Sequence, residues 1–342
     1  MSQTTPRRLL LLCPGRGSYG RAQIGTLPPE SPTVRQLNQL RAEAGRPTLT
    51  ALDATERFFP ALHLAGEHAS LLTFGYTLAD LESLDPDKAQ TVAVVGNSMG
   101  WYTALAAAGA LPLLDAARLV ETLGGYQEAN VIGAQVLYPT AGDDWRAHAV
   151  LTGLVEEALK LPGVYRSIRL GGMTVFGCTR EGLAALNETL PKLQRGDRTF
   201  PLQLPLHSAF HTPLMALTSA RAQVDLKELP WRSPALPMVG GDGYHYGQST
   251  SPAVIARYTL TTQVTDPFDL NLCLRAAMGE HGPDAVLLPG PGNSLGAATA
   301  QILIQLGWRG LRDRRDFEEV QASPRPLVIS MDRPEQRALV CR

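Results

Sequence analysis

The apolar residues of the chain form short continuous runs that alternate with longer stretches of helical periodicity. Continuous runs at residues 7–13, 91–95 and 285–289 predict buried strands, each followed by a turn that contains glycine. Apolar positions with helical spacing predict helices over most of 33–84, after the turn at 96–100, and at 115–130, 209–227, 252–280 and 295–306. The charged tail from about residue 311 is expected to lie at the periphery.

Residues 132–205 have a different pattern. Short strands are predicted at 134–138, 164–169, 173–177 and 199–204, and helices at 145–161 and 180–193. This mixture predicts a compact α+β subdomain of ferredoxin-like type. At 342 residues the chain is long enough for one large domain with a smaller one inserted. We therefore expect a large domain over 1–131 and 206–342, and the subdomain over 132–205.

Composition narrows the functional classes. An apolar content of 44% is ordinary for a globular enzyme, and a net charge of -1 gives no reason to expect nucleic acid or a membrane as partner. The four cysteines show no metal-ligand spacing and are expected to be reduced thiols of a cytoplasmic protein. No apolar stretch approaches a membrane span, and the five-residue run Leu9–Cys13 is too short for a secretory signal.

The clearest chemical signal is the segment Gly96-Asn97-Ser98-Met99-Gly100. It follows a predicted buried strand and precedes an alanine-rich helix, which is the setting of a nucleophile elbow. The glycines permit a sharp turn that exposes the Ser98 hydroxyl, while the free N–H groups of the following helix face an oxyanion formed there.

A serine nucleophile needs a base, and only one histidine segment has a distinctive setting. Residues 206–215 read Leu-His-Ser-Ala-Phe-His-Thr-Pro-Leu-Met, which resembles the H-A-F-H-S-P-L-M signature of acyltransferases of fatty-acid and polyketide synthesis. Residues 14–19 (Pro-Gly-Arg-Gly-Ser-Tyr) are similar to the P-G-Q-G-S-Q loop of that family, as are Pro60-Ala61-Leu62 to Q-P-A-L and Gly290-Pro291-Gly292 to G-P-G-x-x-L. Over residues 8–305 the chain thus resembles the malonyl-CoA:acyl-carrier-protein transacylase family.

The resemblance implies an α/β-hydrolase-like domain with a parallel sheet and an inserted ferredoxin-like subdomain. It implies that Ser98 is the nucleophile, that His211 is the base, and that the main-chain N–H groups of Met99 and Arg16 form the oxyanion hole. The family orients its histidine through a backbone carbonyl near an Asn-Pro pair. Asp266 stands in that place here. It is a candidate support for His211, and the alternative is that it caps the next helix.

Departures from the family pattern concern the acyl pocket. The arginine that pairs with the malonyl carboxylate is replaced by Leu123, so that a carboxylate there would be buried without a cation. Asn97, Trp101 and Phe59 replace polar or charged family residues, and Phe210 of the histidine motif is placed in the same pocket. These replacements favour an uncharged acyl group; in the alternative, Arg16 supplies the missing cation and the acyl group is malonyl.

The expected function is the transfer of an acyl group from coenzyme A to an acyl carrier protein through a Ser98 acyl-enzyme. Coenzyme A thioester and phosphopantetheine are substrates, and no metal or permanently bound cofactor is expected. The alternatives are an editing thioesterase of the same fold and a non-catalytic homologue that binds carrier protein. The basic group Arg312, Arg314 and Arg315 is interrupted by aspartates and is interpreted as a solvated helix face.

Overall fold

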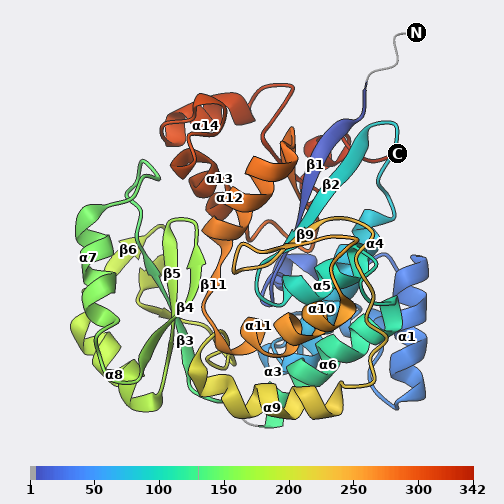
Figure 1. Cartoon of the computed structure of the whole chain (residues 1–342), viewed down its shortest axis with the longest axis horizontal. Coiled ribbons are helices and arrows are strands. Elements are labelled where there is room, and N and C mark those ends of the chain that lie inside the picture. Colours follow the sequence, from blue (N-terminus) through green and yellow to red (C-terminus); the bar gives the residue numbers. More distant parts are fainter. Residues whose placement is uncertain (1–4, 130) are drawn as a thin grey trace.

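The computed structural model describes residues 5–129 and 131–342 and contains two sheets that lie side by side (Figure 1). The larger has the strand order β10-β9-β2-β1-β12-β13 and is parallel except for β10. Its strands are β1 (Arg7–Cys13), β2 (Ala89–Gly96), β9 (Met238–Val239), β10 (His245–Tyr246), β12 (Ala285–Leu288) and β13 (Val328–Ser330). The mixed α/β class with a parallel sheet is therefore confirmed.

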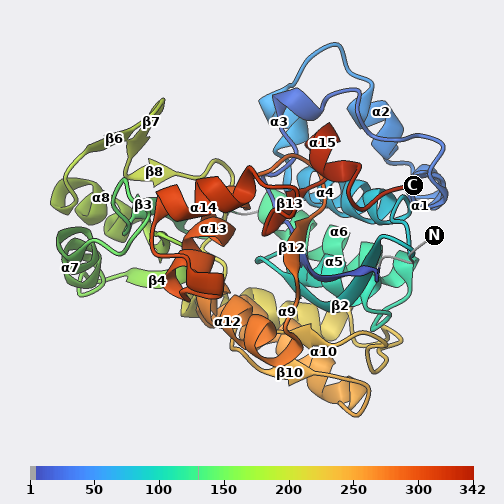
Figure 2. The same cartoon turned by 90° about the horizontal axis from the view of Figure 1, so that it is seen from above.

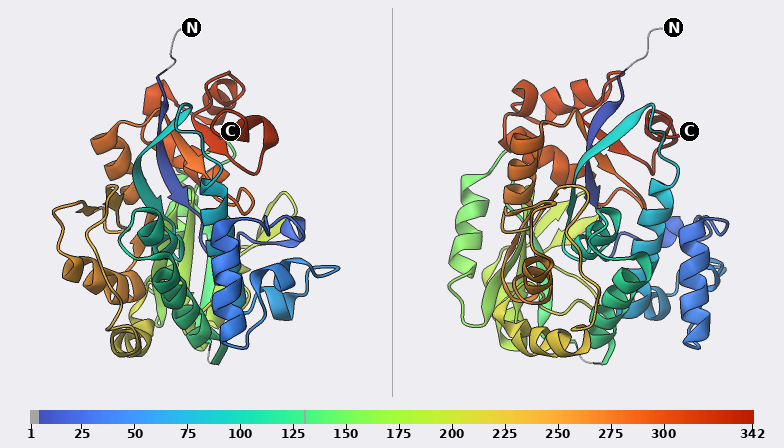
Figure 3. Two further views of the ribbon diagram at one scale, coloured as in Figure 1. Left: turned by 90° about the vertical axis from the view of Figure 1, so that its right-hand side faces the viewer. Right: turned by 45° about the vertical axis from the view of Figure 1, so that its right-hand side comes forward.

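The long apolar runs form the centre of this sheet because it is covered on both faces. Alternate residues of β1 point into two separate cores: Leu9 and Leu11 into one, and Leu10 and Leu12 into the other. The first core includes α1 (Pro32–Glu43), α4 (Gly66–Leu81), α5 (Gly100–Ala107) and α6 (Leu113–Ala129). The second includes α12 (Leu270–His281), α13 (Gly296–Gln305) and α14 (Arg314–Gln321). Figure 3 shows β1 (blue) beside β2 (cyan).

The smaller sheet has the order β11-β4-β5-β3-β8. It consists of β3 (Ala134–Pro139), β4 (Val164–Leu170), β5 (Met173–Cys178), β8 (Leu202–Gln203) and β11 (Phe268–Asp269). One face carries α7 (Ala149–Ala158) and α8 (Arg180–Thr189), and residues of the opposite face, such as Ile168 and Val175, join the core of the large sheet. A two-stranded hairpin of β6 (Leu193–Arg195) and β7 (Arg198–Phe200) projects beside it (Figure 2).

The remaining elements are short or connect the two sheets. They are α2 (Leu49–Asp53), α3 (Pro60–His63), α9 (Ala216–Asp225), α10 (Pro252–Leu260), α11 (Thr262–Thr265) and α15 (Pro334–Arg337), with 3₁₀ turns at Arg21–Gln23, Pro213–Met215 and Trp308–Gly310. No helix within the described residues is both long and apolar enough to cross a membrane.

Two findings differ from the sequence expectations. The charged tail is not wholly peripheral, because β13 pairs with β12 and supplies buried residues to the large sheet. In addition, β11 lies at 268–269, outside the expected subdomain, yet it pairs in parallel with β4. The small sheet is thus completed by a strand from a distant part of the chain.

Candidate active site

Ser98 lies at the carboxyl end of β2, on a turn that only this sequence of glycines permits. Its backbone is left-handed, with φ 55°, although it is not a glycine. A Cβ on Gly96 would lie 2.1 Å from the carbonyl of Gly100, and a Cβ on Gly100 would lie 2.2 Å from the carbonyl oxygen of Cys13. Both glycines are therefore required by close backbone contacts, and the turn directs the serine hydroxyl away from the sheet.

The hydroxyl of Ser98 meets the imidazole of His211. The distance from Ser98 Oγ to His211 Nε2 is 2.8 Å, which is a hydrogen bond. His211 is also held in the left-handed region, with φ 61°, and its main-chain N–H donates to the carbonyl of Val264 at 2.8 Å. The structure thus brings together the two residues, 113 positions apart, that the sequence motifs identified as nucleophile and base.

His211 is buried, and burial lowers its pKa to about 4 because the charged imidazolium is desolvated. The main-chain carbonyl of Gln263 acts in the opposite direction and favours the protonated ring. Nδ1 nevertheless has no hydrogen bond of regular geometry within the described part of the chain. The imidazole is accordingly neutral at pH 7, as a general base must be.

Asp266 does not support this histidine. Its side chain is exposed, and its Oδ1 accepts a hydrogen bond from Thr265 at 2.7 Å. The expectation that its carboxylate holds His211 is therefore wrong. The turn after α11 directs Asp266 toward solvent, and it is the carbonyl three residues earlier that acts on the ring.

Gln263 is a site residue that the sequence did not indicate. Its side chain is buried, and Nε2 donates to the main-chain oxygen of Ser98 at 2.8 Å. Its Oε1 accepts from the hydroxyl of Tyr258 at 3.2 Å, and that hydroxyl in turn accepts from the N–H of Gly241. One residue thus contacts the main chain of Ser98 through its side chain and the ring of His211 through its main chain.

A cavity of about 40 Å³ adjoins the Ser98 hydroxyl. This is room for about three water molecules, and hence for a short acyl group. Its apolar wall is formed by Met99, Tyr102, Val120, Leu123 and Phe210, and its polar wall by Arg16, Ser70, Gln127, Gln135, His207 and Ser208. The cavity is therefore less apolar than the sequence suggested.

Three of the residues assigned to the acyl pocket lie elsewhere. Trp101 is fully buried, with its indole N–H donating to Thr259 at 2.9 Å, on the side of α5 that faces α10. Phe59 is partly exposed and stacks against His63. Asn97 lines the neighbouring cleft rather than the cavity. Leu123 and Phe210 do line the cavity.

Arg16 enters the same cavity from the glycine-rich loop. Its guanidinium donates to Gln127 Oε1 at 2.6 Å and to the carbonyl of Leu64 at 2.7 Å. Gln127 Oε1 also accepts from the N–H of Ser208 at 3.2 Å. The guanidinium is therefore held against α6 and the histidine segment, and neither Gln127 nor Gln135 was indicated by the sequence.

A second space of about 190 Å³ leads from Ser98 between the two sheets. The loop 15–18 and Asn97 form one side of this cleft, and Leu137, Ile168, Leu170, Val175 and Leu204 form the other. His207 lies between cavity and cleft, and burial beside Arg16 lowers its pKa to about 4. This arrangement accommodates an elongated, largely uncharged group that ends at the serine hydroxyl.

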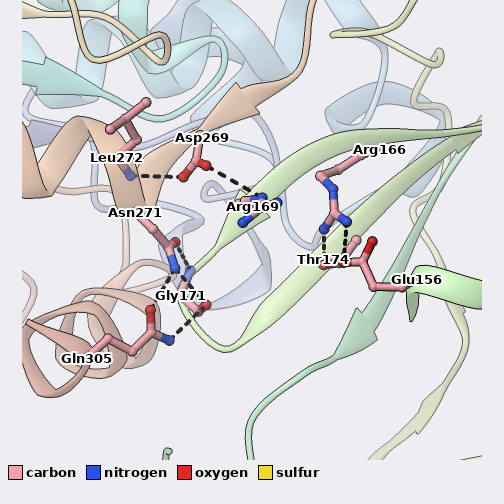
Figure 4. A network of polar contacts seen from close by, with 9 residues as sticks. All are labelled: Glu156, Arg166, Arg169, Gly171, Thr174, Asp269, Asn271, Leu272 and Gln305. Carbon is pink, nitrogen blue, oxygen red and sulfur yellow. Dashed lines mark hydrogen bonds and ion pairs between the residues drawn. The ribbon is translucent and has the colours of Figure 1, made fainter. Parts of the chain in front are cut away.

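The small sheet, which carries Leu137, Ile168, Leu170 and Val175 of the cleft wall, is attached to the large part of the molecule at the turn between β4 and β5. Asn271 of α12 donates to the carbonyl of Gly171 and accepts from its N–H, and Gln305 of α13 donates to the same carbonyl (Figure 4). A Cβ on Gly171 would lie 2.6 Å from the carbonyl oxygen of Ala298. The turn between β4 and β5 is thus fixed against two helices.

The basic group of the charged tail is paired with acidic residues. Arg312, Arg314 and Arg315 each pair with an acidic residue four positions later: Asp316, Glu318 and Glu319. No cluster of three or more potential metal ligands occurs among the described residues.

Comparison with known proteins places this geometry in a structural context. No protein-family model matches the sequence. No curated protein matches it either. Solved structures do match over almost the whole chain. The acyl-carrier-protein S-malonyltransferase of Burkholderia pseudomallei has a TM-score of 0.72 at 20% identity, covering 97% of this chain and 99% of that one.

Two further structures agree. The malonyl-CoA:acyl carrier protein transacylase of Xanthomonas oryzae has a TM-score of 0.71 at 23% identity and covers 98% of both chains. A malonyl-transacylase in complex with a type II polyketide-synthase acyl carrier protein has a TM-score of 0.71 at 18% identity, with 98% of this chain and 99% of that one covered. At these identities the likeness establishes architecture, and the chain has the fold of the malonyl-CoA:acyl carrier protein transacylases.

Proposed function

We propose that the protein is an acyltransferase that moves an acyl group from coenzyme A to the phosphopantetheine thiol of an acyl carrier protein through an ester on Ser98. The observation that carries the proposal is the 2.8 Å contact between Ser98 Oγ and the neutral, buried His211. The carrier protein as acceptor is suggested by the complexed transacylase of the same fold.

In the first half-reaction His211 Nε2 takes the proton of the Ser98 hydroxyl while Oγ attacks the thioester carbonyl carbon. The resulting oxyanion is stabilised by the main-chain N–H groups of Met99 and Arg16, two residues that line the cavity. The carbon–sulfur bond then breaks, and the imidazolium returns its proton to the leaving thiolate of coenzyme A. The second half-reaction reverses these steps, with the carrier thiol as the attacking group.

The acyl group is proposed to be short and uncharged. Its size follows from the 40 Å³ cavity. Its charge follows from Leu123, which presents no cation, and from Arg16, whose guanidinium is engaged by Gln127 and Leu64. A malonyl group would require Arg16 to leave these acceptors, or its carboxylate would be buried against leucine at a cost of several kcal/mol.

The test is the intact mass of the protein after brief incubation with acetyl-CoA and, separately, with malonyl-CoA. We expect an acetyl adduct on the wild type, none on Ser98→Ala, and formation slowed by about 10²-fold or more in His211→Ala. A malonyl adduct alone would contradict the uncharged acyl group and would assign the carboxylate to Arg16. Release of free coenzyme A without an adduct or transfer would indicate hydrolysis instead.

Transfer is tested by adding holo carrier protein to the acylated enzyme. The mass of the adduct should move from the enzyme to the carrier protein. Loss of the adduct to water, at the same rate with and without carrier protein, would contradict the proposal.

A further inference from the structure

A pocket of about 280 Å³ lies between the end of the small sheet and α14, outside the acyl cavity and the cleft. It is bordered by Pro139, Trp145, Gly172, Arg195, Gln301 and Arg314. None of these residues takes part in the chemistry of Ser98. The pocket is therefore separate from the reacting groups and is available to bind another part of a substrate.

The pocket follows the cleft along two elements. On β3, Gln135 borders the acyl cavity, Leu137 borders the cleft and Pro139 borders the pocket. On the opposite side, Leu295 at the start of α13 borders the cleft, and Gln301 of the same helix borders the pocket. Both elements thus run from the site of the nucleophile toward the pocket.

The distance along this path matches the arm carried by both proposed substrates. Gln135 and Pro139 are four residues apart, or about 13 Å of extended strand. The pantetheine arm is about thirteen bonds long from sulfur to phosphorus, which equals about four residues of extended chain and about 14 Å. An arm with its sulfur at Ser98, beside Gln135, that runs along β3 would therefore place its phosphate near Pro139.

The pocket has more positive than negative charge. Arg195 and Arg314 line it together with one acidic residue, Asp143, and guanidinium groups bind phosphate oxygens in bidentate fashion. Their present carboxylate partners, Asp143 and Glu318, are well exposed, and exposed ion pairs are weak enough to be exchanged. Arg195 also donates through Nη2 to the carbonyl of Ala141, at 3.3 Å.

Trp145 fixes one of these arginines. The guanidinium of Arg314 lies over its ring, 5.0 Å from the centroid, and Phe317 packs against the same indole. Trp145 itself is held in the left-handed region, with φ 65°, which is costly for a large side chain. Among the three arginines around 312–315, Arg314 alone is positioned at the pocket.

We infer that this pocket, bordered by Trp145, Arg195 and Arg314, receives the phosphate group that ends the pantetheine arm. That phosphate is common to coenzyme A and to the carrier protein, so that one pocket serves both half-reactions. The inference rests on the proposed function for the identity of the arm.

The test compares donors that differ only beyond the arm: acyl-pantetheine without phosphate, acyl-4′-phosphopantetheine and acyl-CoA. In Arg195→Gln and Arg314→Gln we expect KM for the two phosphate-bearing donors to rise by about two- to five-fold each, and by about ten-fold in the double variant. For acyl-pantetheine, the KM of each variant should stay close to the KM of the wild type. Arg315→Gln, on the same helix but outside the pocket, is the matched control and should match the wild type with all donors.

A binding measurement keeps this inference separate from the proposed chemistry. Calorimetry of coenzyme A and of pantetheine with the resting enzyme should show weaker binding of coenzyme A alone in the arginine variants. In the kinetic comparison, an equal rise in KM for all three donors would overturn the phosphate assignment. A rise in KM for acyl-CoA but not for acyl-4′-phosphopantetheine would overturn it as well. Absence of any Ser98 adduct in the wild type would instead count against the proposed function, while the coenzyme A measurement would still report on the pocket.

Discussion

Ser98 and His211 are both non-glycine residues with left-handed backbones, at φ 55° and 61°. Each such conformation costs about 1–2 kcal/mol, which the rest of the fold must offset. These backbone conformations place Ser98 Oγ 2.8 Å from His211 Nε2 without any rearrangement. The pair that we propose to react is therefore in contact before any substrate binds.

Burial of His211 predicts an acid-shifted activity profile. With its pKa lowered to about 4, the imidazole stays neutral and basic down to about pH 5. The rate of Ser98 acylation should be constant from about pH 8 to 5 and should fall to half near pH 4. The acylation rate is measured as single-turnover release of coenzyme A at each pH. Circular dichroism at the same pH values shows whether the protein remains folded.

His207 provides the control for this prediction. Its pKa is also lowered to about 4, but it makes no contact with Ser98 Oγ of the kind that His211 makes. His207→Gln should therefore leave the midpoint of the profile in place. A midpoint near 6.5 in the wild type would show that the base is solvated.

Residues with strong local signals could be predicted from the sequence, and residues defined by tertiary contacts could not. Ser98 and His211 each stand in a motif that has its own backbone geometry. Gln263 acts because a helix from another part of the chain brings its amide to the carbonyl of Ser98. Trp101 lies in the core and not in the predicted acyl pocket. Helical periodicity shows that a residue is buried but does not show which of two buried helix faces borders the pocket.

At the level of elements, the elbow depends on how closely β1, β2 and α5 approach one another. Gly100→Ala would place a methyl group 2.2 Å from the carbonyl of Cys13, and neither backbone can move freely. We expect a loss of about 3 kcal/mol in the free energy of unfolding, or failure to fold. Urea denaturation measures the change.

Gly125 is the matched control for this substitution. It lies within α6, and a Cβ there would meet nothing within 4 Å. Gly125→Ala should therefore stabilise the protein by about 0.5–1 kcal/mol, since alanine favours the helix. Equal effects of the two substitutions would show that close contact is not what requires Gly100.

Strands could be predicted where at least four apolar residues follow one another in a strand that is covered on both faces. The runs at β1, β2 and β12 are apolar because helices lie on either side. β9, β10 and β11 have two residues each and β13 has three, too few for any periodicity. Their pairing is decided by neighbours far along the chain.

For the whole molecule, one contact that joins the two sheets is between the small sheet and the helices α12 and α13. Gly171→Ala would bring a methyl group to 2.6 Å from the carbonyl of Ala298 at this junction. Gly45→Ala is the control, since Gly45 has a similar φ of +66° against +62° but open space around it, and it borders neither the cleft nor the phosphate pocket. Both should lose about 1 kcal/mol from the strained backbone, and Gly171→Ala about 1–3 kcal/mol more.

The same pair of variants separates stability from function. If the junction sets the width of the cleft, Gly171→Ala should also raise KM for acyl-CoA, while Gly45→Ala changes the free energy of unfolding alone. Equal decreases in the free energy of unfolding of the two variants would show that the junction accommodates the added methyl group without loss of stability.

The strand β11 has a consequence for any attempt to treat residues 132–205 as a separable module. A fragment with these bounds would lack Phe268 and Asp269, and the main-chain groups of β4 that pair with them would be left open. An open, partly apolar edge invites pairing between copies. Such a fragment should therefore aggregate when expressed alone, and a graft of the small sheet onto another scaffold would have to carry its own cover for that edge.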